Sequence, residues 1–168
     1  PRKPDPVVLG SVIGMNTVEH CNALIDDALA KGAKLLCGGK ATNTLMAATV
    51  LDHVTPAMRI YHEETFGPVK AVVRVRGVEE AVACANDNEY GLSAAVFGSD
   101  MARAFNVARR IDSGICHVNG PTVHDEAQMP FGGVKGSGMG RFGGKAGVAE
   151  FTELRWITLQ TTPRHYPF

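Results

Sequence analysis

The chain has 168 residues, and its 17 lysines and arginines balance its 17 aspartates and glutamates, giving a formal net charge of +0 at pH 7. A neutral chain lacks the basic excess that binds phosphates, so neither nucleic acid nor a membrane surface is expected as a partner. Hydrophobic residues make up 45% and charged residues 20%, which is typical of a globular domain and excludes a wholly disordered chain.

The start of the chain favours a soluble protein that is part of something longer. No apolar run approaches the roughly 20 residues of a membrane span, and the proline-broken segment 1–6 lacks the apolar stretch of a signal peptide. The chain opens at Pro1 without a methionine, as expected of a piece of a longer or processed protein. Its four cysteines form no C-x-x-C pair and have no histidine at metal-ligand spacing, so we expect no metal site and buried thiols in a reducing cytoplasm.

The first half of the chain predicts one helix and two strands. Apolar residues recur at three- and four-residue steps over 17–31, which indicates an amphipathic helix. Two short apolar runs follow at 33–37 and 48–54, separated by the turn-rich segment 38–43, and both are predicted to be strands.

From position 69 the pattern alternates regularly between strands and helices. Strands are predicted over 69–75, 92–97 and 115–119, with helices over 78–88 and 100–112 between them. Strand, helix and strand with short connections indicate βαβ units, so we expect an α/β fold in which these three strands lie parallel and helices cover the sheet.

The regular pattern ends after position 119. Residues 120–144 are rich in glycine and proline without periodicity, and a segment of that length is usually functional or part of an interface. Residues 150–160 alternate partly and are predicted to form an extended strand, followed by a polar arm over 161–168.

One match to a nucleotide-binding motif is rejected. Gly138-Met139-Gly140-Arg141-Phe142-Gly143 fits G-x-G-x-x-G, but no strand is predicted before it, and no acidic residue lies about 20 positions later to bind a ribose. We expect close backbone packing to explain these glycines.

The segment His62-Glu63-Glu64-Thr65-Phe66-Gly67-Pro68-Val69 carries two open interpretations. In the first, a glutamate carboxylate accepts both hydroxyl hydrogens of a ribose diol, and the phenyl ring of Phe66 lies against a nicotinamide. Alternatively, it is a solvated acidic turn in which Phe66 packs inward. Since no second histidine follows one helical turn later, it is not a zinc-binding H-E-x-x-H motif.

The segment around the third strand also carries polar residues. Cys116 and His117 are neighbours in the predicted strand and point to opposite faces, so they are not expected to form a thiolate–imidazole pair. The loop 119–131 leaves the carboxyl end of that strand, where ligands collect in open α/β sheets. For its polar residues His124, Asp125 and Glu126, a solvated loop is the alternative.

Three groups of residues follow one another along the chain: Glu63-Glu64-Thr65-Phe66-Gly67-Pro68-Val69, then Ala85-Asn86 with Tyr90-Gly91-Leu92-Ser93 and Val96-Phe97, then Pro130-Phe131-Gly132-Gly133-Val134-Lys135-Gly136-Ser137-Gly138-Met139-Gly140-Arg141. They resemble the NAD(P)-dependent aldehyde dehydrogenase superfamily, in that family's order and spacing from about Gly10 to Ile157. The run from His117 to Phe131 and the closing His165-Tyr166-Pro167-Phe168 are most similar to the branch acting on aromatic aldehydes such as salicylaldehyde, vanillin and benzaldehyde.

The resemblance implies a catalytic-domain fold of that family, with a βαβαβ parallel or mixed sheet and flanking helices. Residues 1–148 would form most of this domain, and residues 149–168 an oligomerisation strand and arm. The family's nucleophilic cysteine, in a Gly-Gln-x-Cys stretch, and its general-base glutamate, in a Glu-Leu-Gly-Gly stretch, lie upstream of the matching region. Neither motif occurs here, so no catalytic residue is assigned.

The resemblance does imply binding residues. Glu64 would hold the ribose on the nicotinamide side of the cofactor, and Phe66 would contact the nicotinamide ring. Phe131 would help to form the channel for the aromatic substrate, with Val123, His124 and Asp125 near its mouth. NAD is the expected cofactor, and NADP stays open because the residues that select between them lie upstream in the family.

The resulting hypothesis is a fragment of a cytoplasmic enzyme that oxidises a salicylaldehyde-like aldehyde to the acid through a cysteine thiohemiacetal and thioester. Its expected partners are the upstream part of the enzyme, the aldehyde and the cofactor, and further copies in a homodimer or tetramer. The chain alone would be inactive. Two alternatives stay open: a semialdehyde or acylating dehydrogenase on the same scaffold, and a stand-alone oligomerisation or interaction module.

Overall fold

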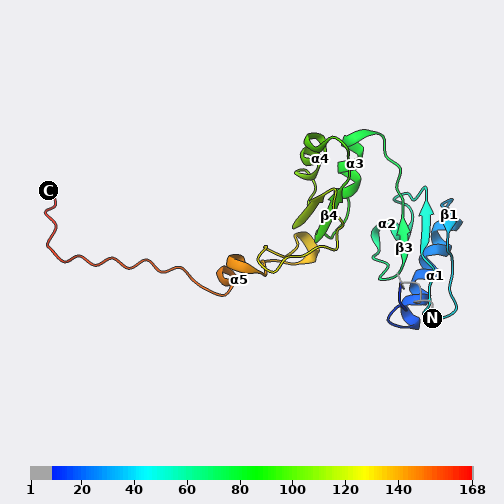
Figure 1. Ribbon diagram of the computed structural model, residues 1–168, viewed down its shortest axis with the longest axis horizontal. Helices are drawn as coiled ribbons and strands as arrows, with labels where there is room; N and C mark the ends of the chain where they lie inside the picture. Colours follow the sequence, from blue (N-terminus) through cyan, green and yellow to red (C-terminus); the bar gives the residue numbers. More distant parts are fainter. Residues whose placement is uncertain (1–8, 168) are drawn as a thin grey trace, which may run out of the picture. The chain divides into compact units, whose positions relative to one another are not determined.

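The structure is a computed structural model that describes residues 9–167. The segment 1–8, whose composition argued against a signal peptide, and the final Phe168 lie outside the described residues. The chain divides into two compact units, Pro1–Asn88 and Glu89–Phe168, each with its own sheet (Figure 1).

The first unit is built on the long helix α1 (Met15–Ala30), which confirms the helix predicted over 17–31. One stripe of its side chains is completely buried, as the three- and four-residue spacing requires. This stripe consists of Val18, Cys21, Leu24, Ile25 and Ala28. It forms the centre of a core cluster that also includes Leu51, Met58 and Val69. Burial of apolar surface by α1 is therefore what joins the helix to the sheet beneath it.

The sheet of the first unit has the order β1-β2-β3. Its strands are β1 (Lys34–Cys37), β2 (Thr49–Asp52) and β3 (Val69–Ala71), which lie within the three predicted strand segments. β1 is antiparallel to β2, with an irregular register near Cys37, and β2 is parallel to β3. Two helices complete the unit, α2 (Arg59–His62) and α3 (Gly77–Asn86).

The second unit contains a βαβ arrangement with parallel strands. β4 (Ser93–Val96) pairs in parallel with β5 (Ile115–Val118), and α4 (Met101–Ala108) connects them. The Asp100 side chain caps α4 by accepting a hydrogen bond from the backbone N–H of Arg103 at 3.0 Å. The predicted strand–helix–strand order from 92 to 119 is confirmed.

The predicted α/β class with parallel and mixed sheets is confirmed, but one detail of the strand pairing differs. β3 was expected to lie in one sheet with β4 and β5, whereas it pairs with β2 in the first unit. The alternating pattern identifies strands and their direction. It does not identify the neighbour, because an upstream strand with an apolar face offers the same hydrogen-bonding edge.

Three short elements and the end of the chain differ from the sequence pattern. The structure adds α2, the 3₁₀ turn η1 (Lys135–Ser137) and the helix α5 (Gly144–Glu150). These have four, three and seven residues, too few to show a helical period, and α5 is rich in glycine. Glu150, predicted to begin a strand, instead ends α5, and residues 152–160 form no strand in this single chain (Figure 1). Pairing of that segment with another copy stays a prediction.

Residues 9–167 contain neither a candidate membrane-spanning helix nor a candidate metal-binding group. In that range no helix is both long and apolar enough to cross a membrane, and no group of three or more His, Cys, Asp or Glu residues is placed to hold a metal ion. The four cysteines are free thiols. Cys21 is buried, as expected. The expectation of a buried thiol is wrong for Cys37, which lies exposed on the irregular end of β1. Cys84 and Cys116 are half-buried.

Asp52, at the end of β2, is a buried charged residue in the first unit. Arg74 donates hydrogen bonds to its carboxylate from Nε, to Oδ1 at 2.9 Å and to Oδ2 at 3.2 Å, and from Nη2, to Oδ2 at 2.6 Å. The backbone N–H of His53 donates a further one at 2.7 Å. These hydrogen bonds, of which those from Arg74 have the largest effect, lower the pKa of Asp52 to about 2. Because the folded chain favours the charged form, this carboxylate stabilises the fold above its ordinary pKa, and that contribution is lost as the pH falls.

We therefore predict a pH-dependent effect of Asp52→Asn on stability. The difference in free energy of unfolding between the original chain and the variant should be constant above pH ~5 and shrink between the ordinary pKa of ~3.9 and the folded value of about 2. Urea unfolding at a series of pH values measures it. Asp26→Asn, which removes an exposed ion pair with Lys40, is the control and should show little effect at any pH. A difference for Asp52→Asn that does not change with pH would contradict the assignment.

Candidate substrate pocket and cofactor-binding loop

The loop 63–68 lies at the surface of the first unit and exposes both candidate cofactor-binding residues. Glu64 is exposed, and the Phe66 side chain is 75% exposed. The alternative in which Phe66 packs inward is therefore wrong. Phe66 has φ 47°, a left-handed backbone conformation that bulky residues rarely adopt. A backbone outlier of this kind persists only where surrounding contacts hold it, and such outliers are frequent at binding sites.

Contacts with α1 hold this loop. The carbonyl of Glu64 lies 3.0 Å from Nε2 of His20, and because a carbonyl only accepts, that ring nitrogen carries the hydrogen. The thiol of Cys21 donates to the carbonyl of Thr65 at 3.3 Å, and burial raises the pKa of the Cys21 thiol, which keeps it protonated as a donor. The Thr65 hydroxyl bonds within the loop, to the carbonyl of Gly67 at 3.1 Å. The backbone is thus fixed while the side chains of Glu64 and Phe66 remain exposed.

The two neighbouring glutamates of the loop have different roles. Glu63 forms a two-point ion pair with Arg59, Nε to Oε1 at 2.7 Å and Nη2 to Oε2 at 2.8 Å, and this lowers the pKa of Glu63. The Arg59 backbone N–H in turn donates to Asp27 of α1 at 2.8 Å. Glu63 therefore belongs to the loop's attachment to the first unit, and Glu64 is the carboxylate presented to solvent.

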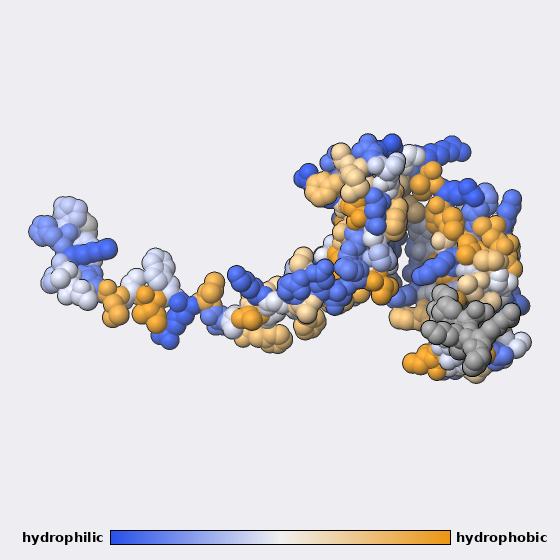
Figure 2. Space-filling view, viewed as in Figure 1, coloured by the Kyte–Doolittle hydropathy of each residue, from blue (hydrophilic) through white to orange (hydrophobic). Residues whose placement is uncertain are grey.

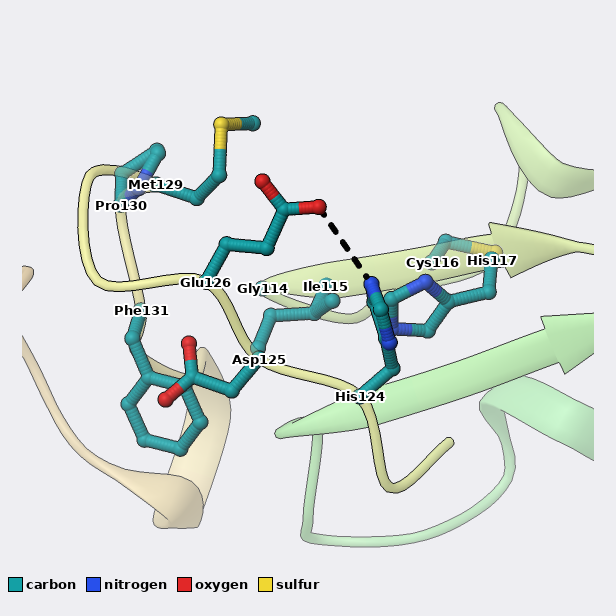
Figure 3. A pocket seen from close by; sticks show the side chains of 10 residues that line it. All are labelled: Gly114, Ile115, Cys116, His117, His124, Asp125, Glu126, Met129, Pro130 and Phe131. Carbon is teal, nitrogen blue, oxygen red and sulfur yellow. Dashed lines mark ion pairs between the residues drawn. The ribbon is translucent and has the colours of Figure 1, made fainter. Parts of the chain in front are cut away.

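The second unit contains a pocket of about 370 Å³ beside β5, called here the β5 pocket. Its wall comes from β5 and from the loop 119–131, which returns along the strand (Figure 3). It is lined by Gly114, Ile115, Cys116, His117, His124, Asp125, Glu126, Met129, Pro130 and Phe131. Three of the four predicted channel residues, His124, Asp125 and Phe131, are thus brought together. The fourth, Val123, is 92% exposed and is not part of the lining.

Backbone and side-chain hydrogen bonds fix the two ends of the returning loop. At its start, Asn119 bonds to Gly98 in both directions, accepting at 2.8 Å and donating at 2.9 Å, so its amide extends the pairing of β4 and β5. At its end, Phe131 forms an isolated antiparallel bridge with Phe142, with bonds of 2.9 and 2.7 Å. The residues between these ends line the pocket or face solvent.

The polar groups of the β5 pocket interact with one another. His124 Nε2 lies 3.5 Å from Glu126 Oε1 (Figure 3). Gln128 also donates a hydrogen bond to the Glu126 carboxylate. The rings of His117 and His124 meet edge to face, with centroids 5.7 Å apart. Burial raises the pKa of the Cys116 thiol. A protonated thiol is a poor nucleophile, so Cys116 is part of the wall rather than a reactive centre.

The sequence analysis did not assign two polar residues of this pocket, His117 and Glu126, to the substrate channel. It considered His117 only as a partner of Cys116, and it treated Glu126 as one of three loop residues with a solvated alternative. The signal that could have indicated them is their position, in a strand and in the loop that directly follows it. A loop that returns along its own strand places the side chains of both around one cavity.

Close backbone packing, the explanation predicted for the glycines of the rejected G-x-G-x-x-G match, holds for Gly143 but not for Gly138, around which nothing lies within 4 Å. Gly138, Gly140 and Gly143 all have positive φ values, of 120°, 77° and 84°. A side chain on Gly140 would meet the Glu150 carboxylate at 2.9 Å, and one on Gly143 would collide with the carbonyl of Met129. The segment follows η1 rather than a strand, and it therefore lacks the context of a phosphate-binding loop.

The contact between the loop 63–68 and α1 generates a prediction. A Cβ atom on Gly67 would lie 2.6 Å from Sγ of Cys21, so Gly67→Ala should destabilise the chain by about 1–3 kcal/mol in urea unfolding. Cys21→Ala opens that space, so the double variant should lose less stability than the sum of the two single variants. Gly10→Ala, where nothing lies within 4 Å, is the control. Additive losses would show that the two residues are not in contact.

Comparisons with known proteins identify the family of the chain. The model of the aldehyde dehydrogenase family matches residues 1–157. Vanillin dehydrogenase of Pseudomonas sp. (strain HR199 / DSM 7063) is 58% identical over 160 residues, which cover 95% of this chain and 33% of that protein. The chain thus spans about a third of the length of this relative.

Two solved structures show the same fold. A salicylaldehyde dehydrogenase from Pseudomonas putida G7, complexed with salicylaldehyde, has a TM-score of 0.87 at 51% identity, covering 95% of this chain and 33% of that one. An aldehyde dehydrogenase of Mycobacterium tuberculosis, complexed with NAD+, has a TM-score of 0.79 at 33% identity, covering 86% and 31%. From its sequence and its fold, this chain belongs to the aldehyde dehydrogenase family.

Proposed function

We propose that this chain is the carboxyl-terminal part of an NAD(P)-dependent enzyme that oxidises an aromatic aldehyde to the carboxylic acid. The observation that carries this proposal is the β5 pocket, which combines the Phe131 ring with the polar side chains of His124 and Asp125 in a chain of the aldehyde dehydrogenase family. A volume of about 370 Å³ is in the range of small-molecule sites. The similarity to dehydrogenases named for vanillin and salicylaldehyde supports an aromatic substrate.

The loop 63–68 fits the nicotinamide end of the cofactor. An exposed carboxylate at Glu64 can accept the two hydroxyl hydrogens of a ribose, and the exposed ring of Phe66 offers a flat apolar face. Both groups project from a backbone that His20 and Cys21 hold in place. NAD, or NADP, would supply the hydride acceptor when bound. Glu64 and Phe66 would orient its reactive end.

The proposed reaction places bond-making groups outside these 168 residues. A cysteine thiolate would attack the aldehyde to give a thiohemiacetal, and oxidation to a thioester would precede hydrolysis by a water activated by a general base. The thiols of Cys21 and Cys116 are unsuited to this attack, because burial raises the pKa of each. This chain would instead fix the aldehyde and the cofactor in position. Misplacement of a reactant by 1 Å can slow a reaction about 100-fold.

The end of the chain supports assembly into a homodimer or tetramer. We assign residues 1–148 to the catalytic domain and 149–168 to an oligomerisation segment. Several large apolar side chains of this segment are exposed and separated by polar ones (Figure 2). They are Phe151, Leu154, Trp156, Ile157 and Leu159. A second copy would cover them. Four free thiols suit a reducing cytoplasm.

Glu64→Gln tests the cofactor-binding role in the full-length protein. Hydrogen bonds to a charged group contribute roughly 1.5–3 kcal/mol, so we expect hydride transfer or cofactor release to change on the order of tenfold, with less effect on aldehyde recognition. Stopped-flow measurement of NADH formation and release, at saturating and limiting NAD, separates these steps. Glu63→Gln is the matched control, because that carboxylate is bound by Arg59. Unchanged kinetics for Glu64→Gln would remove Glu64 from the site.

The isolated chain should show no turnover with NAD and benzaldehyde, because the proposed nucleophile lies upstream. It should also self-associate in sedimentation, since the apolar side chains of its end are exposed. Robust turnover by the chain alone would overturn the proposed division of roles. A clean monomer without turnover would favour the alternative, a self-sufficient interaction module. If the upstream part of the enzyme restores turnover, comparing the rates with benzaldehyde and with a semialdehyde distinguishes an aromatic aldehyde dehydrogenase from a semialdehyde dehydrogenase.

A further inference from the structure

We infer that His117 determines substrate specificity by recognising a hydroxyl group on the aromatic ring of the aldehyde. This inference rests on the proposed function and goes beyond it, because it assigns a substituent of the substrate to one atom of the β5 pocket. His117 comes from β5 itself, whereas the other polar residues of the pocket come from the returning loop (Figure 3).

The first argument is an unmatched polar atom. Nε2 of His117 is buried and has no hydrogen-bond partner, the only such side-chain nitrogen or oxygen among residues 9–167. Nearly all buried polar groups in proteins are hydrogen-bonded, so an unpaired one requires an explanation, such as a functional role or a partner that binds there. The imidazole lines a pocket of about 370 Å³, so a small molecule in that space would lie against the ring that carries this unpaired nitrogen.

The second argument is the chemistry of the partner. A neutral imidazole nitrogen either donates or accepts, depending on the tautomer, and a phenolic hydroxyl can do both. A hydroxyl therefore matches Nε2 of His117 in either tautomer. An aldehyde or carboxylate oxygen matches only one, because these oxygens cannot donate. The hydroxyl is thus the group best suited to this position.

The third argument is the arrangement of the surrounding groups. The Glu126 carboxylate is already bound by His124 and Gln128, so it does not compete for the His117 nitrogen. The ring of His124 stands edge to face against that of His117, with centroids 5.7 Å apart. Apolar side chains of the same pocket, Ile115, Met129 and Phe131, offer a surface for a benzene ring. The pocket thus combines an apolar wall with one buried hydrogen-bonding atom that has no partner.

The test compares hydroxylated and plain substrates in the full-length protein. His117→Phe keeps an aromatic ring and removes the nitrogen. For the best of the 2-, 3- and 4-hydroxybenzaldehydes, we expect kcat/KM to fall roughly tenfold to a hundredfold, with little change for benzaldehyde. His117→Asn retains a polar group and should recover part of the preference. The control, His124→Phe, removes the other imidazole of the pocket and should not remove the preference for the hydroxyl.

A binding experiment gives a second measurement that needs no turnover. Benzamide and its hydroxylated forms are unreactive and differ only in the ring hydroxyl. In ¹⁵N-histidine NMR spectra of the full-length protein, a hydroxybenzamide should shift the Nε2 signal of His117, and benzamide should not. Equal shifts with both ligands, or no shift with either, would overturn the inference.

The two proposals fail in different ways. If benzaldehyde is oxidised and His117→Phe leaves the ratio of hydroxylated to plain substrate unchanged, the inference about His117 is wrong and the proposed function stands. If no aromatic aldehyde is oxidised, the proposed function is wrong, and the benzamide experiment alone decides whether Nε2 of His117 binds a ring hydroxyl.

Discussion

The burial of one face of α1 is the constraint on which the first unit depends. The same helix face performs two tasks, because Cys21 contributes to the apolar core and its thiol also bonds to the loop 63–68. His20, its neighbour on the helix, bonds to the preceding carbonyl of that loop, that of Glu64. A loop carrying a bulky residue at positive φ would relax if left unsupported. Its shape therefore follows from the packing of a helix that lies more than 40 positions earlier in the sequence.

The β5 pocket is built on a different principle, in which a strand and its own following loop enclose a cavity. The loop is fixed at its two ends, by the amide of Asn119 and by the bridge between Phe131 and Phe142, and the Ser93 hydroxyl also donates to the carbonyl of Thr122. Glycines allow the backbone of the segment after the loop to lie close to the starts of the strands. A side chain on Gly114 would collide with the backbone at Gly132, and Val134 bonds to the carbonyl of Gly91 at 2.9 Å. The glycine-rich segment therefore seals the amino ends of β4 and β5, rather than binding phosphate.

Much of the fold is predictable from the sequence, because periodicity reports local structure. The helix α1 and the strands β4 and β5 were predicted from the spacing of apolar residues, and all three are observed. The partner of β3 was not predictable, because strand pairing depends on contacts between distant segments. The helices α2 and α5 have too few residues to show a period.

The candidate site was predictable only in part, for a related reason. Family-specific motifs indicated Glu64, Phe66, His124, Asp125 and Phe131, and the structure places the last three in one pocket. The importance of His117 was hidden, because a lone histidine in a strand has no sequence pattern of its own. What distinguishes it is a missing hydrogen bond, which exists only in three dimensions. Val123 illustrates the reverse case, since its neighbours line the pocket while its own side chain points to solvent.

The two fixed points of the returning loop have a consequence for how such a pocket diversifies. The Asn119 amide and the Phe131–Phe142 bridge depend on backbone atoms and on one side chain, so they do not require any particular residue between 120 and 130. Replacements and small insertions in that interval alter the lining without disturbing the strands. The lining of the pocket can therefore change between residues 120 and 130 while β4 and β5 keep their structure, so new ligand preferences can arise with little loss of stability.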